Sequence, residues 1–237
     1  METAIALVSG GLDSVVALAK GLEIYDVKLM LTFHYGQRAW PQELKASQAV
    51  ASHYAISQRV IHLPWLAELL PKALKPKQSA FPQSELLEDS SLLGLPSSHN
   101  IDPAYTETAK VWVPNRNGVF LNIGAAIAEA YSAKIILFGA NVDEAQGFPD
   151  NTQEYRDYVN QSLSYSTLVN VQVETPVGEL TKAEIIQEGV RLGVPLEKIW
   201  SCYEGSEIQC GVCPSCKLLK TALASCDKPV SIAFGND

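Results

Sequence analysis

The chain has 237 residues, of which 47% are hydrophobic and 19% are charged, and its formal net charge is −8. This length suits one α/β domain with a small appendage. No apolar run reaches the roughly 18 residues of a membrane span, and the first residues lack the basic start of a signal peptide. The negative net charge disfavours nucleic-acid partners, because proteins that bind nucleic acids usually cluster Lys and Arg on one face. We therefore expect a cytoplasmic protein with no membrane or nucleic-acid partner.

The predicted elements alternate between strand and helix from the start of the chain. Short apolar runs predict buried strands, and Pro41 suits the first turn of a helix. Strands are expected at 4–8, 27–33 and 58–63, and helices at 15–22 and 41–55. This alternation is typical of an α/β fold with a doubly wound, Rossmann-like parallel sheet that has helices on both faces.

Residues 65–110 interrupt this order. From residue 71 onward Ser, Pro and polar residues dominate, and the periodicity disappears. A stretch of this kind is typical of a lid over a site or of a family-specific insert, and an ordinary disordered loop fits the composition equally well. We therefore assign 65–110 as an insert or lid and leave its role open.

The alternation returns in the second half of the chain. Further elements are expected as a helix at 118–133, a strand at 134–141, a polar helix at 152–168 and a short strand at 171–176. The first of these helices carries an apolar stripe formed by Phe120, Ile123, Ile127 and Tyr131.

A capping box marks the start of the C-terminal region. Thr181 and Glu184 have the spacing that opens a helix, and Gly193 suits the end of that helix. We therefore predict a nucleotide-binding α/β domain at 1–180 and a small, helical, metal-binding region at 181–237.

Residues 9–14, with the sequence SGGLDS, join the first strand to the first helix. Two glycines let the backbone turn sharply and approach an anion, and the helix points free N–H groups and the positive end of its dipole at that anion. Ser9 and Ser14 add hydroxyl donors, and Asp13 suits a magnesium ion that accompanies phosphates. The loop matches neither G-x-x-x-x-G-K-[ST] nor G-x-G-x-x-G. The order of elements predicts a phosphate site, although Gly-Gly and Asp-Ser also form ordinary turns.

Four of the five cysteines crowd together near the C-terminus, at Cys202, Cys210, Cys213 and Cys216. Thiolates two residues apart can face one ion across a tight turn, and four of them complete a tetrahedral zinc site. Without a secretory signal, the pattern favours metal ligands over disulfides, while an iron–sulfur cluster also uses four cysteines. Four sulfur ligands leave no position for water, so we assign the metal a structural role. Cys226 stands apart and is expected to be a small buried residue.

Several segments together resemble a known family. SGGLDS resembles the PP-loop, S-G-G-x-D-S, of the ATP pyrophosphatase superfamily. In chain order the segments are SGGLDS, VPNRN, FGANVDE, GFPDN, LTKAEI, LGVPLEKIWSCYEG and CGVCPSCKLLK. In combination they resemble the 7-cyano-7-deazaguanine synthase family of queuosine biosynthesis over nearly the whole chain, except about residues 65–105.

The resemblance implies an ATP-dependent carbon–nitrogen ligase that converts 7-carboxy-7-deazaguanine and ammonia into 7-cyano-7-deazaguanine. AMP transfer would activate the carboxylate, ammonia would give an amide, and a second adenylation followed by loss of AMP would leave the nitrile. Such catalysis depends on positioning and charge neutralisation. The resemblance also implies an adenine nucleotide alpha hydrolase-like fold, magnesium with ATP, one structural zinc per chain and a homodimer.

The resemblance assigns the site residues as well. The catalytic residues would be Asp13, Arg116 and Lys182. ATP would contact Val8, Ser9, Gly10, Gly11, Leu12, Asp13, Ser14, Gly139 and Asp143. The deazaguanine substrate would contact Arg116, Asn117, Phe148, Asp150 and Tyr203. Arg116 could form a forked pair with phosphate or carboxylate, whereas Lys182 and Asp143 could equally be an exposed first-turn lysine and a turn residue.

Four positions depart from the family pattern, and other functions stay open. Many relatives have Cys-Arg where this chain has Asn151 and Thr152, Arg where it has Lys220, and a basic residue where it has Gln209. These departures concern substrate contacts. The alternatives are a PP-loop enzyme that modifies tRNA, a relative that transfers the activated deazaguanine to another acceptor, and a non-catalytic nucleotide-binding module.

Overall fold

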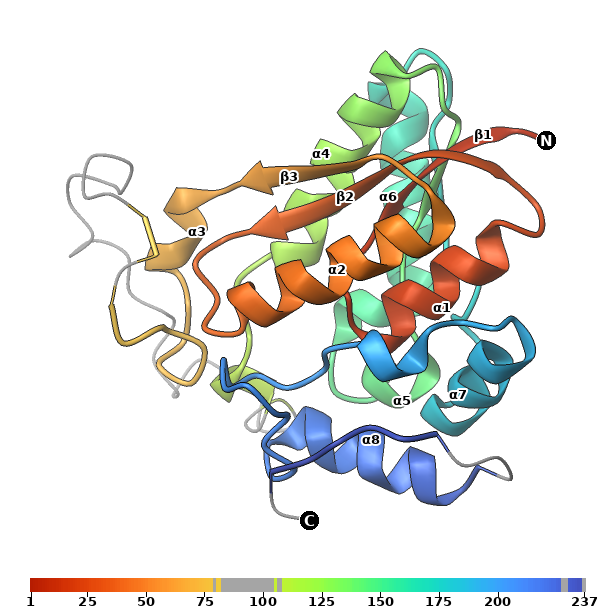
Figure 1. Ribbon diagram of the computed structural model, residues 1–237. Helices are drawn as coiled ribbons and strands as arrows, with labels where there is room; N and C mark the ends of the chain where they lie inside the picture. The colour runs from red at the N-terminus through yellow and green to blue at the C-terminus, as the bar shows by residue number, and fades with distance from the viewer. Residues whose placement is uncertain (79, 82–104, 106–107, 227–229, 236–237) are drawn as a thin grey trace.

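Figure 1 shows the computed structural model, which describes the chain except for residues 79, 82–104, 106–107, 227–229 and 236–237. Within the described residues, five parallel strands form one sheet in the order β3-β2-β1-β4-β5. The strands are β1 (Thr3–Leu7), β2 (Asp26–His34), β3 (Gln58–His62), β4 (Ile135–Leu137) and β5 (Gln172–Glu174). The order reverses direction between β1 and β4, which confirms the doubly wound sheet and places a ligand-binding crevice at their carboxyl ends.

Helices cover both faces of the sheet. In Figure 1, α1 and α2 lie in front of the strands, α4 and α6 lie behind them, and α7 and α8 lie below. The longer helices are α1 (Leu12–Gly21), α2 (Trp40–Tyr54), α4 (Arg116–Ala130), α6 (Gln153–Ser166), α7 (Lys182–Arg191) and α8 (Pro214–Ala224). The shorter ones are α3 (Pro64–Glu68), α5 (Val142–Ala145), η5 (Thr108–Lys110), η6 (Pro149–Asn151) and η7 (Leu196–Lys198).

The two faces of β1 supply two separate hydrophobic cores. Ile5 and Leu7 pack into the cluster on the side of α4, whereas Ala4 and Ala6 pack into the cluster on the side of α1 and α2. Side chains alternate between the faces of a strand, and a central parallel strand is buried on both. This is why the first strand is a continuous apolar run.

The predicted apolar stripe on α4 is partly wrong. Tyr131 is 42% exposed, and the buried face of α4 contains Leu121 together with the small residues Gly118, Gly124, Ala125 and Ala128. A Cβ at Gly124 would lie 3.3 Å from Leu7 Cδ2, so the helix backbone approaches β1 closely. The other residues of the stripe, Phe120, Ile123 and Ile127, are half-buried and pack against the core cluster on this side of the sheet.

The capping box predicted for α7 is present. The Thr181 side chain accepts a hydrogen bond from the Glu184 backbone N–H, and the Glu184 carboxylate accepts one from the Thr181 backbone N–H. The helix buries Ile185 and Ile186 in the cluster that also contains residues of α1 and α8. The C-terminal region therefore packs on the α/β core, and the boundary at residue 180 stays a prediction.

The predicted insert at 65–110 falls largely outside the described residues. At the two ends of this segment the structure has two short helices, α3 and η5, that the sequence did not predict. Every described helix is too short or too polar to serve as a membrane span.

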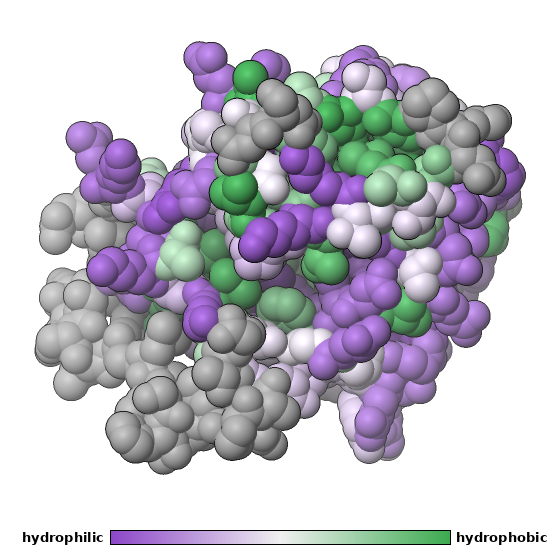
Figure 2. Space-filling view, turned by 90° about the horizontal axis from the view of Figure 1, so that it is seen from below, coloured by the Kyte–Doolittle hydropathy of each residue, from purple (hydrophilic) through white to green (hydrophobic). Residues whose placement is uncertain are grey.

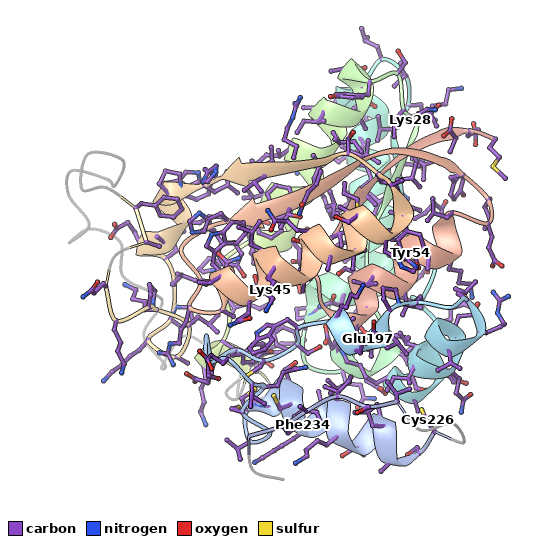
Figure 3. The ribbon with its side chains drawn as sticks, in the orientation of Figure 1. Lys28, Lys45, Tyr54, Glu197, Cys226 and Phe234 are labelled. Carbon is purple, nitrogen blue, oxygen red and sulfur yellow. The ribbon has the colours of Figure 1, made fainter. Side chains whose placement is uncertain are left out.

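Helix α8 crosses the end of the molecule that Figure 2 shows, where hydrophobic and hydrophilic residues alternate over the surface. Leu218 on α8 and Val212 before it are exposed. Figure 3 shows Phe234 and Cys226 at opposite ends of this helix. Cys226 is half-buried against the core, a more open setting than the buried one expected.

Candidate active site and metal centre

The SGGLDS loop is held by its own serines at the end of β1. The Ser9 hydroxyl accepts a hydrogen bond from the Gly11 backbone N–H at 3.2 Å and lies 3.1 Å from the Ser14 hydroxyl. The Ser14 hydroxyl donates to the Gly11 carbonyl at 3.0 Å, across the first turn of α1. Gly11 is the N-cap of this helix and has no side-chain cap. The first N–H groups of α1 are therefore available to an anion.

Two glycines allow close approaches to this loop. Gly10 has φ of +88°, and a Cβ there would lie 2.9 Å from the Ser47 backbone nitrogen of α2. Gly139 follows β4, and a Cβ there would lie 2.6 Å from the backbone nitrogen of Ser14. Strand β4 and helix α2 therefore hold the loop from two sides because neither contact has room for a side chain.

We expect the substitution Gly139→Ala to displace the loop. The added methyl would meet backbone atoms of Asp13 and Ser14, which cannot rotate away. We expect a loss of about 1–3 kcal/mol in the free energy of unfolding and weaker binding of ATP, measured by thermal unfolding and calorimetry. Gly235→Ala is the matched control, since the nearest atom to its new methyl is 3.8 Å away. Unchanged ATP affinity in Gly139→Ala would contradict this role.

Lys182 joins the loop to two other elements. Its Nζ donates to Asp13 Oδ2 at 2.7 Å and to Glu144 Oε1, on α5, at 2.6 Å. Its backbone N–H donates to the Asp143 carboxylate at 2.7 Å, which fixes the start of α7. The side chain of Lys182 is 6% exposed. A capped helix start therefore delivers one buried ammonium to the phosphate loop.

Burial and charge act in opposite directions on this group. Burial raises the pKa of Asp13 to about 6, and the Lys182 ammonium only partly offsets this effect. Burial disfavours the charged form of Lys182, but the carboxylates of Asp13 and Glu144 outweigh it and raise the pKa of the lysine. Lys182 therefore stays an ammonium. Asp13 Oδ1 is buried without a hydrogen-bond partner among the described residues, so this carboxylate is suited to accept a further cation or donor.

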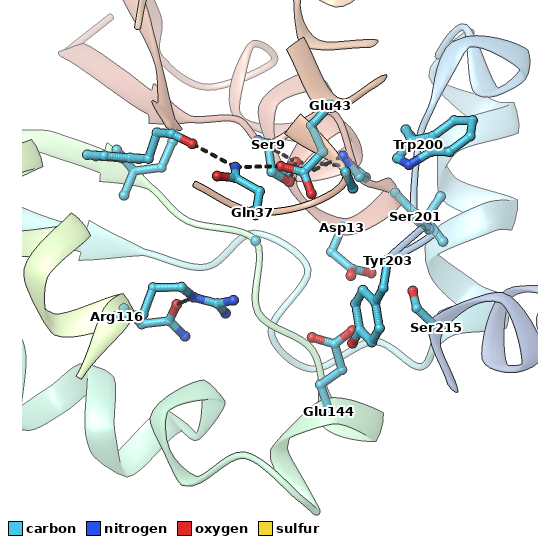
Figure 4. Close-up of a pocket in the computed structure, with 18 of the residues that line it drawn as sticks. Ser9, Asp13, Gln37, Glu43, Arg116, Glu144, Trp200, Ser201, Tyr203 and Ser215 are labelled. Atoms are coloured by element: carbon cyan, nitrogen blue, oxygen red, sulfur yellow. Dashed lines mark hydrogen bonds between the residues drawn. The ribbon is translucent and has the colours of Figure 1, made fainter. Parts of the chain in front are cut away.

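Arg116 lies on the opposite wall of the pocket, at the start of α4 (Figure 4). Its Nε donates to Asn117 Oδ1 at 3.2 Å. Burial disfavours its charge, but Tyr35 and the Asp150 carboxylate raise its pKa. Nearby aromatic rings stack closely, with the centroids of Phe33 and Phe120 at 4.1 Å and an interplanar angle of 4°. The wall thus offers a cation beside flat apolar surfaces.

A second polar pair lies between Arg116 and the loop. Gln37 is 5% exposed and donates to Glu43 Oε2 at 2.8 Å and to the Phe33 carbonyl at 3.0 Å. Its own Oε1 accepts from the Tyr35 backbone N–H at 2.9 Å. Burial raises the pKa of Glu43, against the effects of Gln37 and Arg116.

These walls enclose a pocket of about 240 Å³. It brings together most of the site residues predicted from the sequence, which are Val8, Ser9, Gly11, Leu12, Asp13, Ser14, Arg116, Asn117, Phe148, Gly139, Lys182 and Tyr203. Three predicted residues do not line it. Gly10 makes a turn with positive φ inside the loop, and the Asp143 carboxylate binds the backbone N–H of Lys182 at the start of α7. Asp150 lines a smaller neighbouring pocket.

The sequence interpretation missed several lining residues, which include Gln37, Glu43, Glu144, Trp200 and Ser215. Glu144 stood inside the quoted segment FGANVDE, and its position next to Asp143 was the available signal. Gln37 and Glu43 follow the carboxyl end of β2, where doubly wound folds place ligand-binding residues.

The four clustered cysteines converge at the start of α8. Their Sγ atoms all lie within 4.8 Å of one another, and the Cys213 backbone N–H donates to Cys210 Sγ at 3.3 Å. Gly211, with φ of +71°, makes the turn between them. Burial raises the pKa of Cys202 to about 11, so a bound cation would be needed to keep that thiol ionised at neutral pH. The four could hold one metal ion in a closed tetrahedral site.

Hydrogen bonds join the metal centre to the pocket. The indole N–H of Trp200 donates to the Cys202 carbonyl at 2.8 Å, and the Trp200 backbone N–H donates to the Gly10 carbonyl at 2.9 Å. On the other side of Cys202, Tyr203 lines the pocket and Glu204 accepts two hydrogen bonds from Arg38 at 2.8 and 2.9 Å. The position of Cys202 therefore affects both the phosphate loop and the pocket wall.

Comparisons with known proteins identify relatives of this chain. A family model described as queuosine biosynthesis protein QueC matches residues 3–227. A 7-cyano-7-deazaguanine synthase of Carboxydothermus hydrogenoformans is 46% identical over 222 residues, which cover 94% of this chain and 98% of that protein. The enzyme of the same name from Pelotomaculum thermopropionicum is 46% identical over 213 residues, which cover 90% of this chain and 92% of that protein.

A solved structure is similar in fold. A 4-thiouridine synthetase in complex with RNA and ATP matches with a TM-score of 0.52 and 17% identity, over 99% of this chain and 48% of that chain. At this identity the likeness concerns the fold alone. The match of the family model over nearly the whole length, together with relatives that align end to end, shows that the chain belongs to the QueC family of queuosine biosynthesis proteins.

Proposed function

We propose that the chain is an ATP-dependent 7-cyano-7-deazaguanine synthase that converts 7-carboxy-7-deazaguanine and ammonia into the nitrile. The family and the names of its relatives support this function. The observation that carries it is the meeting of the SGGLDS loop, Lys182 and Arg116 in one pocket. Such a pocket can hold a triphosphate and a carboxylate close together.

The proposed chemistry uses the phosphate loop in two successive adenylation steps. A substrate carboxylate oxygen attacks the α-phosphorus of ATP, and the bond to pyrophosphate breaks. Ammonia then displaces AMP from the acyl carbon and gives an amide. The amide oxygen attacks a second ATP and pyrophosphate leaves, and the loss of AMP and of both amide protons then leaves the nitrile. Pyrophosphate departs in both rounds, so donors fixed around it lower both barriers.

The phosphate loop and Lys182 would hold the departing pyrophosphate. The N–H groups at the start of α1 and the Ser9 hydroxyl supply neutral donors, and Lys182 supplies a charge that is already in place. Magnesium fits here because Asp13 Oδ1 lacks a partner among the described residues and the Glu144 side chain is 30% exposed. Bound with ATP, magnesium would neutralise phosphate charge.

Arg116 would hold the carboxylate of the substrate or the phosphate that is transferred to it. The guanidinium is suited to a forked pair with either group, and Asn117 at 3.2 Å limits its rotation. The flat purine-like ring would lie against aromatic side chains of the pocket, with Phe148 and Tyr203 as candidates. Asp150, just outside the pocket, would act on this ring through Arg116 or after a small shift of η6.

The four cysteines would hold a structural zinc ion, with an iron–sulfur cluster as the alternative. All four positions are taken by protein sulfur, so the metal would support the pocket through Cys202 and its neighbours. A homodimer in the cytoplasm and ammonia as the nitrogen donor are part of the same proposal. An RNA-modifying function is less well supported, because the matching relatives are named as synthases of a small molecule.

The product spectrum tests this function. With ATP, magnesium, ammonium and 7-carboxy-7-deazaguanine together, we expect the nitrile, with two AMP and two pyrophosphate for each molecule formed. Without ammonium, AMP transfer should stop at the acyl adenylate, and without the acid no pyrophosphate should form. An amide or an adduct with another amine as the only product would replace the synthase assignment, and retention of bulk tRNA in a gel shift would favour the RNA-modifying alternative.

A further inference from the structure

Among the residues that the structure describes, three carboxylates line the pocket, and they are held in two ways. Asp13 and Glu144 both pair with the ammonium of Lys182, at 2.7 and 2.6 Å. Glu43 accepts its hydrogen bond from a neutral amide, that of Gln37, at 2.8 Å. Glu43 forms no salt bridge with any of the described residues, so of these carboxylates it is the most open to a new cation.

The orientation of Glu43 is fixed. Gln37 uses its oxygen on the Tyr35 backbone N–H, and its amide nitrogen on the Phe33 carbonyl and on Glu43 Oε2. Gln37 cannot rotate without breaking bonds to the backbone of β2 and the turn after it. Glu43 Oε1 accepts no hydrogen bond from the described residues, and the side chain lines the pocket. One carboxylate oxygen is thus held, and the other accepts no hydrogen bond from the described residues in a side chain that lines the pocket.

Glu43 also lies at the right place between the two groups that would hold the reactants. Its charge interacts with that of Arg116, and its backbone lies against the phosphate loop, since a Cβ on Gly10 would be 3.0 Å from the Glu43 backbone carbonyl. Figure 4 shows the Glu43 carboxylate beside Ser9, with Arg116 facing the same cavity from the other wall. An acyl carbon held between Arg116 and the phosphate loop would have Glu43 as a neighbour.

We propose that Glu43 is a catalytic residue of the amidation step, which binds the ammonium ion in the pocket and takes a proton from it. This inference rests on the proposed function and assigns the nitrogen donor a site. Most ammonia in neutral water is ammonium, which has no lone pair for attack. A half-buried carboxylate attracts the cation, and burial, which raises the pKa of Glu43, makes it a better base.

Two protons leave the nitrogen in this step, and one bond forms as another breaks. Ammonium gives one proton to Glu43 Oε1, and the nitrogen lone pair forms a bond to the acyl carbon. The bond from that carbon to the AMP oxygen breaks, and its electron pair leaves with AMP. The second surplus proton passes from nitrogen to the phosphate of AMP. Glu43 returns its proton to water when the products leave.

The test separates adenylation from amidation in the substitution Glu43→Gln. Exchange of labelled pyrophosphate into ATP, which depends on the acid but needs no ammonium, should match the unsubstituted protein. At neutral pH, kcat/KM for ammonium should fall by about 100-fold, the usual size of a general-base contribution. Hydroxylamine is neutral at this pH, so it needs no base before attack, and with it the variant should form the hydroxamate at close to the normal rate.

Two further variants serve as controls for Glu43→Gln. Glu43→Asp keeps the carboxylate and should show intermediate ammonium dependence with normal exchange, which also serves if Glu43→Gln folds poorly. Glu197→Gln changes an exposed glutamate of η7 and should leave every rate unchanged. Unchanged ammonium dependence in Glu43→Gln would overturn the inference, and so would loss of pyrophosphate exchange, because Glu43 would then act on ATP. Absence of acid-dependent exchange in the unsubstituted protein would instead overturn the proposed function.

Discussion

Replacing Asp13 with Ala is expected to lower AMP formation by at least about 100-fold, the usual cost of removing one fixed electrostatic contact to the reacting phosphates. In the phosphate loop, Asp13 Oδ2 accepts a hydrogen bond from the buried Lys182, while Asp13 Oδ1 has no hydrogen-bond partner among the described residues. Its loss would remove the carboxylate that we propose as a magnesium ligand and leave Lys182 paired with Glu144 alone. Initial rates of pyrophosphate release with saturating ATP measure the effect.

Controls separate this effect from a general loss of structure. Asp157→Ala removes an exposed aspartate on α6 and should keep full activity. Asp13→Asn keeps the shape of the side chain, so a loss as large as that of Asp13→Ala would assign the effect to charge. Both Asp13 variants should retain the metal of the four-cysteine site. Normal AMP formation in Asp13→Ala would remove Asp13 from the catalytic machinery.

Local patterns in the sequence predicted the fold and the loop because their causes are local. A continuous apolar run such as 4–8 predicts a strand buried on both faces, and the glycines after it predict a turn against an anion. The capping box at Thr181 depends on residues three positions apart. In each case the interacting groups lie within one or two turns of the chain.

Contacts between distant segments could not be predicted in this way. Glu144 meets Lys182 across 38 positions, and Glu43 on α2 lines the same pocket. The stripe predicted on α4 was only partly right for a related reason, since its periodicity did not reveal the close approach of Gly124 to β1. These features depend on how the helices pack on the sheet, and a single sequence contains only indirect information about that packing.

Replacing Cys213 with Ser is expected to cause the largest loss of stability. Three thiolates and a hydroxyl bind zinc much more weakly than four thiolates, and a structural zinc site contributes on the order of 10 kcal/mol to folding in small domains. We expect loss of the metal, measured by elemental analysis, and thermal unfolding at a markedly lower temperature. Cys226→Ser is the matched control, because Cys226 lies outside the cluster and should keep both metal and stability.

The metal-free variant should also lose activity, although none of the four cysteines would touch the substrate. The Cys202 carbonyl accepts a hydrogen bond from the indole of Trp200, and the Trp200 backbone N–H donates to the Gly10 carbonyl in the phosphate loop. The residue after Cys202, Tyr203, lies in the pocket wall. Release of the metal would free Cys202 and loosen both contacts, so affinity for ATP should fall together with the melting temperature. Chelation of the unsubstituted protein should reproduce this result, and added zinc should reverse it. A Cys213→Ser protein with one bound metal and full activity would contradict a closed four-sulfur site, and recovery with iron and sulfide but not with zinc would assign a cluster in its place.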